Sequence, residues 1–361
     1  MNDNQRYQRQ VSLKEFGEEG QQKLKAAKVF VAGVGGIGCP ALLYLVAAGI
    51  GKIGFADNDI VSLSNLHRQV LFSQEDIGKP KVLQAEKKLR QINAGVNIIS
   101  HQVELTNLNV LNIIKDYDVI IDGTDNFATK YLLNDACVLL GKPYIYGSVS
   151  RFEGQVAIFN VSEKNIKCNY RDLFPKPPIE KILNCSEDGV LGVVTGIIGT
   201  MQANEAIKLI TGIGMPLINR LMIYNSLNSQ TYTIGISENK KDYDLPLNEE
   251  EFTKMDYYWL CQANKNVEII NASIFRKMLA ENDIAFIDVR ENGEKPDANF
   301  EHTKIPLTMF ENSMQDISKN KIVLFCQTGK RSLQAAQMLL QNDDGSKKVY
   351  SLRGGIVSLF D

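Results

Sequence analysis

The chain has 361 residues, of which 40 are Lys or Arg and 42 are Asp or Glu, so the formal net charge is −2. This balance gives no electrostatic reason to expect nucleic acid as the main partner, and the length favours two domains. The first residues lack a cationic, apolar leader, and the longest weakly polar run, residues 190–201, is too short and rich in glycine to span a bilayer. The six cysteines have no regular spacing, which is typical of reduced thiols. We therefore expect a cytoplasmic protein.

Residues 28–57 have the pattern of strand, glycine turn, helix and strand. A short apolar run leads into the turn Gly33-Val-Gly35-Gly36-Ile-Gly38, and the second strand ends at Asp57. Glycines at these spacings provide a tight turn, close backbone approach to phosphate and close helix–strand packing, with phosphate at the helix N-terminus. A terminal acid is expected to bind ribose. The pattern predicts nucleotide binding, although a glycine-rich turn can also merely connect a strand to a helix.

Charged side chains follow the predicted strands at the edge where α/β sheets bind ligands. Arg68 lies in the polar stretch after Asp57, Lys81 opens a helix predicted to reach residue 92, and Asp125 follows a predicted buried strand. Arg68 and Lys81 could be ordinary surface charges, and Asp125 could be only the N-cap of the helix predicted over residues 127–140. Their common placement favours contacts with a triphosphate, with Asp125 holding Mg²⁺ on the phosphates.

Several further motifs occur in the same order as in one enzyme family. Together with the glycine turn they are Arg6-Tyr-Gln-Arg9-Gln10, Ser62-Leu-Ser-Asn65-Leu-His-Arg68-Gln69, Lys79-Pro-Lys81, Asp122-Gly-Thr-Asp125-Asn126 and Glu153-Gly-Gln155. From about residue 6 to residue 235 the chain resembles the adenylating enzymes of molybdopterin and thiamin biosynthesis, relatives of the ubiquitin-activating enzymes. The resemblance implies a homodimer that uses ATP and Mg²⁺ to adenylate the C-terminal Gly-Gly carboxylate of a ubiquitin-like sulfur carrier, releasing pyrophosphate.

The resemblance also implies roles for individual residues. Nucleotide binding is implied for Gly33, Gly35, Gly36, Gly38, Asp57, Asn65, Arg68, Gln69, Lys81 and Asp125. Asp57 then holds the ribose, Asp125 serves Mg²⁺, and Arg9 is delivered to the nucleotide of the second protomer. Positioning and neutralisation of phosphate charge are what attack on the α-phosphorus requires.

Two cysteine questions follow from the same resemblance. Cys185 matches a loop cysteine that in thiamin-type relatives joins covalently to the carrier, although a small filler thiol remains the alternative. Many relatives also bind structural zinc through two Cys-x-x-Cys pairs. Here the first position reads Asn169-Tyr-Arg-Asp172, with Cys168 one step displaced, and the second pair is missing. Tetrahedral zinc cannot be built from Cys168 alone, so we expect no structural zinc.

A second domain is expected after a polar linker. We place the first domain at residues 1–236, the linker at 237–266, where aromatic residues 257–259 are candidates for docking onto a domain, and the last domain at 267–361. In the last domain a strand ends at Cys326, and Gln-Thr-Gly329-Lys330-Arg331-Ser332 leads into a helix. Backbone amides, a helix N-terminus and cations around such a cysteine stabilise a thiolate or persulfide anion.

This second motif resembles the rhodanese sulfurtransferases. Asp288-Val-Arg-Glu291 and Leu352-Arg-Gly-Gly355 add to the likeness, whereas residues 300–306 match that family only loosely, which leaves partner recognition open. Cysteine phosphatases place arginine six positions after the cysteine, but that position is Ser332 here. The shorter loop therefore favours persulfide chemistry over phosphate hydrolysis, and a buried free cysteine is the remaining alternative.

The sequence thus predicts an α/β fold: a Rossmann-like adenylating domain, with a mixed sheet and helices on both faces, followed by a small α/β rhodanese domain. The expected enzyme is an adenylyltransferase with a sulfurtransferase domain. We expect the acyl adenylate of the carrier to form at Lys81 and Asp125. Persulfide sulfur from Cys326 then attacks the adenylate, and the carrier ends as a thiocarboxylate. Expected partners are a second copy of the chain, the carrier, and a persulfide donor such as a cysteine desulfurase; nucleic acid and membrane are not expected.

Three alternatives stay open at this point. The carrier belongs to either the molybdopterin or the thiamin pathway, although the fused rhodanese is reminiscent of molybdopterin-activating proteins. A nicotinamide-dependent oxidoreductase would share the glycine turn, but it has no use for Arg68, Lys81 and Asp125 together. A module that binds a carrier without activating it would show no ATP–pyrophosphate exchange.

Overall fold

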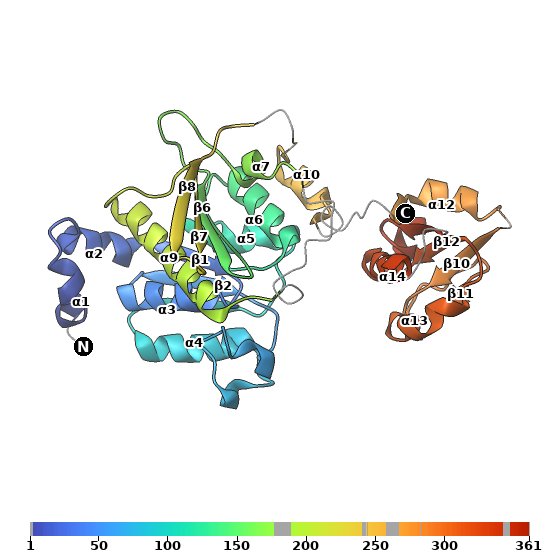
Figure 1. Ribbon diagram of the computed structural model, residues 1–361, viewed down its shortest axis with the longest axis horizontal. Helices are drawn as coiled ribbons and strands as arrows, with labels where there is room; N and C mark the ends of the chain where they lie inside the picture. Colours follow the sequence, from blue (N-terminus) through green and yellow to red (C-terminus); the bar gives the residue numbers. More distant parts are fainter. Residues whose placement is uncertain are drawn as a thin grey trace. The chain divides into compact units, whose positions relative to one another are not determined.

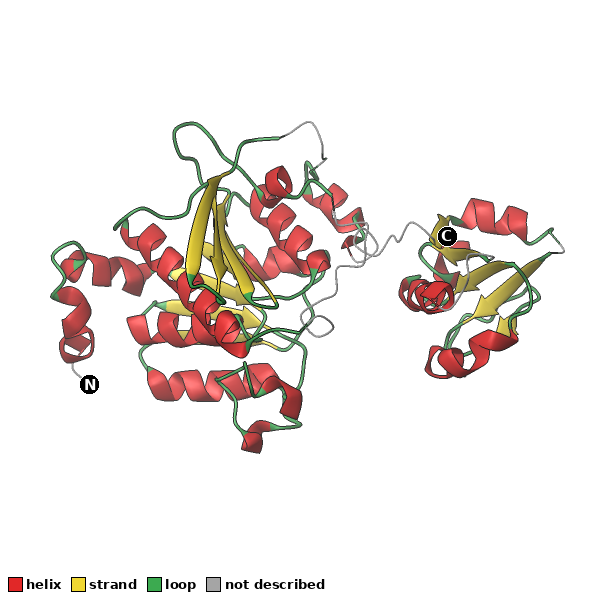
Figure 2. Ribbon diagram, viewed as in Figure 1, coloured by secondary structure: helices red, strands yellow, loops and turns green. Residues whose placement is uncertain are grey.

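The computed structural model divides the chain into two compact units, Met1–Pro177 with Ile182–Tyr257, and Pro178–Lys181 with Tyr258–Asp361. It describes residues 3–176, 189–239, 243, 245–257, 267–281, 283–341 and 347–360, without the side chains at positions 3, 4, 330 and 341. Each unit has its own sheet with helices packed beside it (Figure 2).

The first unit is built on one eight-stranded sheet with the order β3-β2-β1-β4-β5-β6-β7-β8. Its strands are β1 (Lys28–Ala32), β2 (Lys52–Ala56), β3 (Asn97–His101), β4 (Val119–Asp122), β5 (Tyr144–Ser150), β6 (Glu153–Phe159), β7 (Arg220–Asn225) and β8 (Gln230–Gly235). Neighbours from β3 to β5 run parallel, and those from β5 to β8 run antiparallel. The predicted mixed sheet is therefore confirmed.

Helices cover both faces of this sheet. The helices of the unit are α1 (Asp3–Val11), α2 (Gly17–Ala26), α3 (Gly38–Ala48), α4 (Lys81–Ile92), α5 (Val110–Ile114), α6 (Phe127–Leu139), α7 (Tyr170–Leu173), α9 (Gly192–Thr211) and α10 (Glu249–Lys254). α3, α4 and α9 pack together on one face, and α5, α6, α7 and α10 form the other layer (Figure 1). Strands β1 and β4 are buried by these two layers, which explains their nearly continuous apolar sequences.

Helix α5 has only five residues, and the turn before it is closed by a side chain. The Asn109 side chain accepts a hydrogen bond from the Thr106 N–H at 2.9 Å and donates one to the Glu104 carbonyl at 2.8 Å. Asparagine side chains compete in this way with helical backbone bonds. The helix accordingly begins only at Val110.

The chain after β8 packs back onto the first unit. Phe252 of α10 is fully buried, and the Tyr257 hydroxyl donates to Asp135 Oδ2 of α6 at 2.9 Å. The Asn107 amide donates to the Met255 carbonyl at 2.9 Å. Tyr257 is therefore one of the aromatic residues that dock the segment onto a domain.

The second unit has a five-stranded parallel sheet with the order β11-β10-β12-β13-β9. Its elements are β9 (Val267–Ile270), α12 (Ala272–Met278), β10 (Ile284–Asp288), β11 (Thr303–Lys304), α13 (Leu307–Ser313), β12 (Lys321–Phe325), α14 (Lys330–Gln341) and β13 (Lys348–Leu352). This arrangement confirms the predicted small α/β domain.

Sheet register brings the candidate residues of the first unit to one edge. Ala32 of β1 is paired with Ala56 of β2 on one side and with Asp122 of β4 on the other. The loops that follow these three strands therefore emerge together, as the carboxyl ends of parallel strands do. Among the described helices, none combines the length and the apolar composition that crossing a bilayer requires.

Candidate nucleotide and sulfur-transfer sites

The glycine turn joins β1 directly to the start of α3. Gly33 has φ +85°, and a Cβ on Gly38 would lie only 2.0 Å from the Gly33 carbonyl oxygen. Within the described residues, the backbone N–H groups of Gly35 and Gly36 have no hydrogen-bond acceptor. Such donors at a helix N-terminus form an anion site. The turn therefore has the geometry of a phosphate-binding loop.

Asp57 lies beside this turn at the end of β2. Its Oδ2 accepts a hydrogen bond from the Val34 N–H, and its Oδ1 accepts one from the Asp59 N–H, each at 2.8 Å. Each carboxylate oxygen keeps a second lone pair. Asp57 can therefore hold the turn and still accept hydrogen bonds from two ribose hydroxyls.

Lys81 is a buried cation at the start of α4. Its Nζ lies 2.7 Å from Asp59 Oδ2, and the two side chains are 5% and 63% exposed. A buried ammonium needs an anionic partner, and Asp59 is the partner that this structure supplies. Because Asp59 is mostly in water, an incoming phosphate can reach the same cation. Asp59 was missed by the sequence analysis; the only signal was an acid two positions after Asp57.

Gln69 faces the glycine turn from the loop before α4. The residue is 3% exposed, its Oε1 is buried, and that oxygen has no hydrogen-bond partner among the described residues. Its Nε2 would lie 3.9 Å from a Cβ on Gly35. Buried polar atoms are normally paired, so an unpaired one beside a phosphate-binding loop indicates a ligand site.

Asn65 shapes the loop that carries Gln69. Its Oδ1 accepts a hydrogen bond from the Ser62 N–H at 3.2 Å, which closes a single 3₁₀ turn, Leu63–Asn65. Its carbonyl oxygen accepts a hydrogen bond from the Gln69 N–H at 2.9 Å. A direct contact between Asn65 and the triphosphate remains a proposal.

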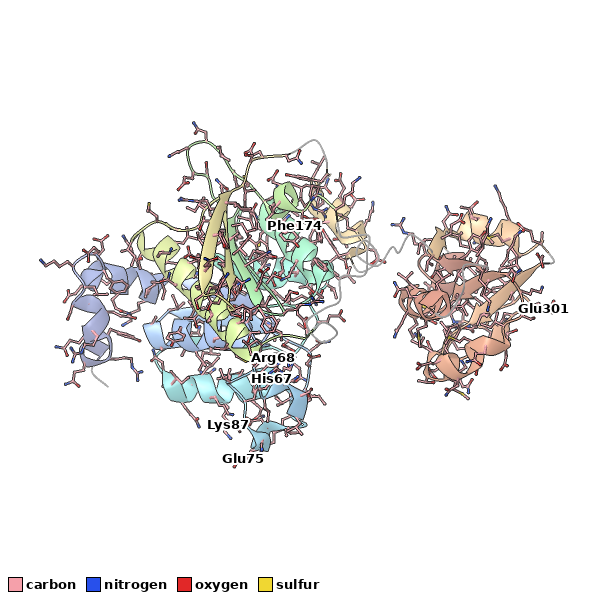
Figure 3. All side chains as sticks on the ribbon, viewed as in Figure 1. His67, Arg68, Glu75, Lys87, Phe174 and Glu301 are labelled. Atoms are coloured by element: carbon pink, nitrogen blue, oxygen red, sulfur yellow. The ribbon has the colours of Figure 1, made fainter. Side chains whose placement is uncertain are left out.

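Arg68 projects from the same loop toward the start of α9, where Figure 3 labels it beside His67. Its Nη1 donates to the Ser64 carbonyl at 2.9 Å and lies 2.8 Å from His67 Nε2. A Cβ on Gly192, the first residue of α9, would lie 3.3 Å from Arg68 Cβ. A cavity of about 620 Å³ opens between this loop and α9. The guanidinium therefore stays accessible to a ligand.

Asp125 lies on a loop that begins at the buried, hydrogen-bonded residue Asp122. Asp122, at the end of β4, is fully buried; its Oδ2 accepts hydrogen bonds from the Tyr144 hydroxyl at 2.7 Å and from Lys130 Nζ at 3.0 Å. Asn126 rather than Asp125 is the N-cap of α6, because its side chain accepts a hydrogen bond from the Thr129 N–H at 2.8 Å. The capping interpretation of Asp125 is therefore wrong.

The Asp125 carboxylate is exposed, and no hydrogen bond or ion pair engages it within the described residues. Nor do the described His, Cys, Asp and Glu side chains gather in groups of three or more that could hold a metal ion. One carboxylate together with phosphate oxygens is nevertheless a typical Mg²⁺ environment in nucleotide enzymes. The free amides, the unpaired Gln69 oxygen, Lys81 and Asp125 therefore fit ATP with Mg²⁺.

Arg9 is not brought to this site within one chain. In α1, the Tyr7 hydroxyl accepts a hydrogen bond from Asn93 Nδ2 at 2.7 Å, and Gln10 Nε2 donates to the Ala48 carbonyl at 3.3 Å. Ala48 is the last residue of α3, whereas the glycine turn lies at the N-terminus of that helix. The two ends of an 11-residue helix are about 16 Å apart. Arg9 is exposed at the far end.

The second site is the loop between β12 and α14. Cys326 is fully buried at the end of β12, and the Gly329 N–H points at its Sγ with an N–S distance of 3.1 Å. The Ser332 hydroxyl donates to the Gly329 carbonyl at 3.1 Å, and the Ile356 N–H donates to the Cys326 carbonyl at 2.7 Å. The loop is thereby curled around the sulfur at the N-terminus of a 12-residue helix, where a sulfur anion is stabilised.

Other cysteines differ from Cys326 in their surroundings. Burial raises the pKa of Cys39 to about 12, and burial also raises the pKa of Cys137. Such thiols are unreactive packing residues. Cys185 lies within residues 177–188, outside the described part of the chain, so the structure does not test its predicted role.

The segment around Asn169, where the resembling enzymes have zinc ligands, is held by hydrogen bonds among described residues. Asn169 caps α7, and Asp172 Oδ1 accepts a hydrogen bond from the Tyr243 hydroxyl at 2.7 Å. Cys168 is buried, its sulfur donating to the Ile236 carbonyl at 3.4 Å. These bonds join the α7 segment to the chain after β8.

The fold and the two sites together define a two-domain α/β enzyme in which a nucleotide-binding domain is followed by a domain with a loop cysteine. The ThiF family model matches residues 7–245, and the model of the Rhodanese-like domain matches residues 271–360. The chain belongs to the ThiF family and carries a C-terminal rhodanese-like domain. It is an adenylyltransferase with a sulfurtransferase domain, as predicted, and not the oxidoreductase that would share the glycine turn.

Relatives with both domains match over most of the chain. The probable adenylyltransferase/sulfurtransferase MoeZ of Mycobacterium tuberculosis is 38% identical over 98% of this chain and 92% of its own length. A sulfur carrier protein adenylyltransferase of Thermus thermophilus is 45% identical over 65% of this chain and 88% of its length. The adenylyltransferase and sulfurtransferase MOCS3 of Culex quinquefasciatus is 45% identical over 71% of this chain and 58% of its length.

Solved structures confirm the fold of the first unit. Escherichia coli MccB, in a crystal structure with AMPCPP and selenomethionine MccA, has a TM-score of 0.58 and 25% identity, covering 67% of this chain and 75% of that one. The crystal structure of PaaA has a TM-score of 0.54 and 22% identity, covering 66% and 74%.

Proposed function

We propose that this enzyme adenylates the C-terminal glycine carboxylate of a ubiquitin-like sulfur carrier, of the type found as the small subunit of molybdopterin synthase, and then converts it to a thiocarboxylate. The observation that carries the proposal is that a phosphate-binding turn, buried Lys81 and unpaired Asp125 share one sheet edge in the same chain as the Cys326 loop. The name of the Thermus relative supports a sulfur carrier as the substrate, and the name of the Culex relative supports the combination of adenylyl transfer with sulfur transfer.

In the first step, a carboxylate oxygen of the carrier attacks the α-phosphorus of ATP, and pyrophosphate leaves with the electron pair. The Gly35 and Gly36 amides, Lys81 and Arg68 take up phosphate charge, and Asp57 orients the ribose. Mg²⁺, held by Asp125 and phosphate oxygens, would neutralise the leaving pyrophosphate. The chain thereby contributes positioning and electrostatic stabilisation rather than a covalent step.

In the second step, the terminal sulfur of a Cys326 persulfide attacks the acyl carbon, and AMP leaves. A second thiolate then attacks the Cys326 sulfur, so the carrier departs as a thiocarboxylate and a disulfide forms, which a thiol reductant opens. Cys185 is our candidate for this second thiol or for a covalent link to the carrier. A persulfide on a partner protein such as a cysteine desulfurase would reload Cys326.

The same chemistry on a thiamin-pathway carrier is the alternative. The deciding experiment incubates the enzyme with ATP, Mg²⁺, a persulfide donor and either carrier, and follows the carrier by intact mass spectrometry. We expect the mass of an adenylate without the sulfur donor and of a thiocarboxylate with it, for the molybdopterin-type carrier. No mass change on either carrier would contradict the proposal, and a change on the thiamin carrier alone would select the alternative.

We further propose that the enzyme is a homodimer in which Arg9 acts on the partner's nucleotide, because α1 lies at the far end of α3 from its own turn. An inactive Arg9→Ala subunit mixed with an inactive Asp125→Ala subunit should regain ATP–pyrophosphate exchange, since one of the two sites then has both residues. Exchange in isolated heterodimers, carrying different affinity tags, measures this rescue. Heterodimers as inactive as both parents would show that Arg9 does not act across the interface.

We also propose that the domain needs no structural zinc, because the Tyr243 hydroxyl accepts a hydrogen bond from Asn169 and donates one to Asp172, which joins the two segments that zinc ties in relatives. Metal analysis of the same preparation should find well below one zinc per chain, and one zinc per chain would contradict this. The use of ATP and of free thiols fits a cytoplasmic location.

A further inference from the structure

Two arginines near the Cys326 loop are paired with carboxylates. Arg290 is buried, and its Nη2 lies 2.7 Å from Asp288 Oδ2. Arg331, in the first turn of α14, donates from Nη1 and Nη2 to the two oxygens of Glu294 at 2.6 Å each. This two-point geometry is the strongest form of an arginine–carboxylate pair.

Glu294 belongs to a segment, residues 291–297, that contacts the Cys326 loop at two points. One is the Arg331 pair, and the other is the Gln327 amide, which donates to the Lys295 carbonyl at 2.8 Å. The Glu291 N–H donates to Glu294 Oε1 at 2.7 Å and holds the carboxylate in place. The Arg331 guanidinium lowers the pKa of Glu294 to about 2, so this carboxylate is charged at neutral pH.

Arg331 also lies next to the loop that surrounds the reactive sulfur. It follows Cys326 by five positions, and the pKa of Arg331 is raised first by Glu294 and then by the charge of the Cys326 thiolate. The guanidinium is therefore within electrostatic reach of both charges. The side chains of Arg331 and Glu294 are 32% and 27% exposed, so solvent reaches the pair and screens part of its strength. The pair also changes the net charge that a sulfur donor meets.

We propose that Glu294 is a positioning residue that sets donor selectivity: by fixing Arg331 and cancelling its charge, it makes the Cys326 loop favour a sulfur donor with one negative charge, such as a cysteine persulfide, over the thiosulfate dianion. The inference rests on the proposed sulfur transfer to Cys326. With a free Arg331 the loop would present an additional positive charge, which attracts a dianion more than a monoanion.

The reaction that reports on this selectivity is transfer from a small donor. The Cys326 thiolate attacks the outer sulfur of thiosulfate, the S–S bond breaks, and its electron pair leaves with sulfite, so Cys326 carries a persulfide anion. Methanethiosulfonate, a monoanion, reacts in the same way and releases methanesulfinate. Cyanide then takes the sulfur as thiocyanate and restores the thiolate.

Steady-state kinetics on the full chain with both donors test the role of Glu294. Glu294→Gln should lower the KM for thiosulfate about fivefold, with a smaller change for methanethiosulfonate and little change in kcat. Glu294→Asp keeps the charge, so the ratio of the two KM values should stay at the wild-type ratio. Glu281→Gln is the matched control, because Glu281 pairs with Lys321 at the opposite end of β12, with 3.3 Å between Nζ and Oε2.

A double variant separates charge from structure. In an Arg331→Met background, Glu294→Gln should no longer change the KM ratio, because the cation that it uncovers is absent. A uniform loss of kcat/KM with both donors, or an unchanged KM ratio in Glu294→Gln, would overturn the proposed role of Glu294. A wild-type enzyme inactive with both small donors and with a protein persulfide would instead overturn the sulfur transfer on which the inference rests.

Discussion

Lys81→Ala should lower ATP–pyrophosphate exchange by about 100- to 1,000-fold, because Lys81 is a buried cation at the sheet edge where we propose that ATP binds. Within the described part of the chain, its ion-pair partner is the largely exposed Asp59, so its charge is available to a nucleotide. Asp125→Ala should cause a comparable loss. Among the described residues, the loop after β4 offers no second carboxylate that could bind Mg²⁺ in its place. Exchange of labelled pyrophosphate into ATP, with carrier present, measures both.

Lys87→Ala is the matched control for Lys81. Lys87 lies on the same helix, α4, and is exposed, and Figure 3 labels it away from Arg68 and His67. This variant should keep wild-type exchange. The Lys81 and Asp125 variants should also keep sulfur transfer from thiosulfate to cyanide, which shows that the second domain is folded. Near-normal exchange in Lys81→Ala would remove Lys81 from the active site.

Local signals were sufficient for much of the fold. The turn Gly33–Gly38 can be predicted because its constraints are local: residues other than glycine rarely adopt a φ near the +85° of Gly33, and a Cβ on Gly38 would clash with the Gly33 carbonyl oxygen. Strands β1, β2 and β4 and the helices that follow them were found for the same reason, since their apolar patterns are bounded by turns. Cys326 followed from a strand end, a glycine-containing loop and a helix start.

Partners that are distant in sequence were not predictable. Asp59 meets Lys81 across 22 positions, and Arg331 meets Glu294 across 37, so no spacing rule connects them. The buried Asp122, Lys130 and Tyr144 network likewise depends on the pairing of β4 with β5. The sequence is sufficient to place the candidate residues at one sheet edge. The side chains that hold them there can be identified only from the tertiary structure.

Cys326→Ser should abolish sulfur transfer from thiosulfate or from a protein persulfide, because a hydroxyl cannot carry the terminal sulfur. Adenylation should persist, since the residues that we propose to bind nucleotide belong to the other unit, which has its own sheet. Thiocyanate formation and ATP–pyrophosphate exchange, measured on one preparation, separate the two activities. Asp125→Ala is the reciprocal control, because it should lose exchange and keep thiocyanate formation.

Cys185→Ser completes this test of the coupled reaction. It should keep both adenylation and the loading of Cys326 with sulfur. If Cys185 is the second thiol, the carrier should stay bound to Cys326 as an acyl disulfide, because the thiolate that releases it is missing; if Cys185 links covalently to the carrier, the adenylate should accumulate. Intact mass spectrometry of carrier and enzyme measures all three species. Thiocarboxylate formed at the wild-type rate by Cys185→Ser would show that Cys185 is a packing residue. The same result for Cys326→Ser, with a protein persulfide as donor, would show that the rhodanese-like domain does not deliver the sulfur and that adenylation alone is the contribution of this chain.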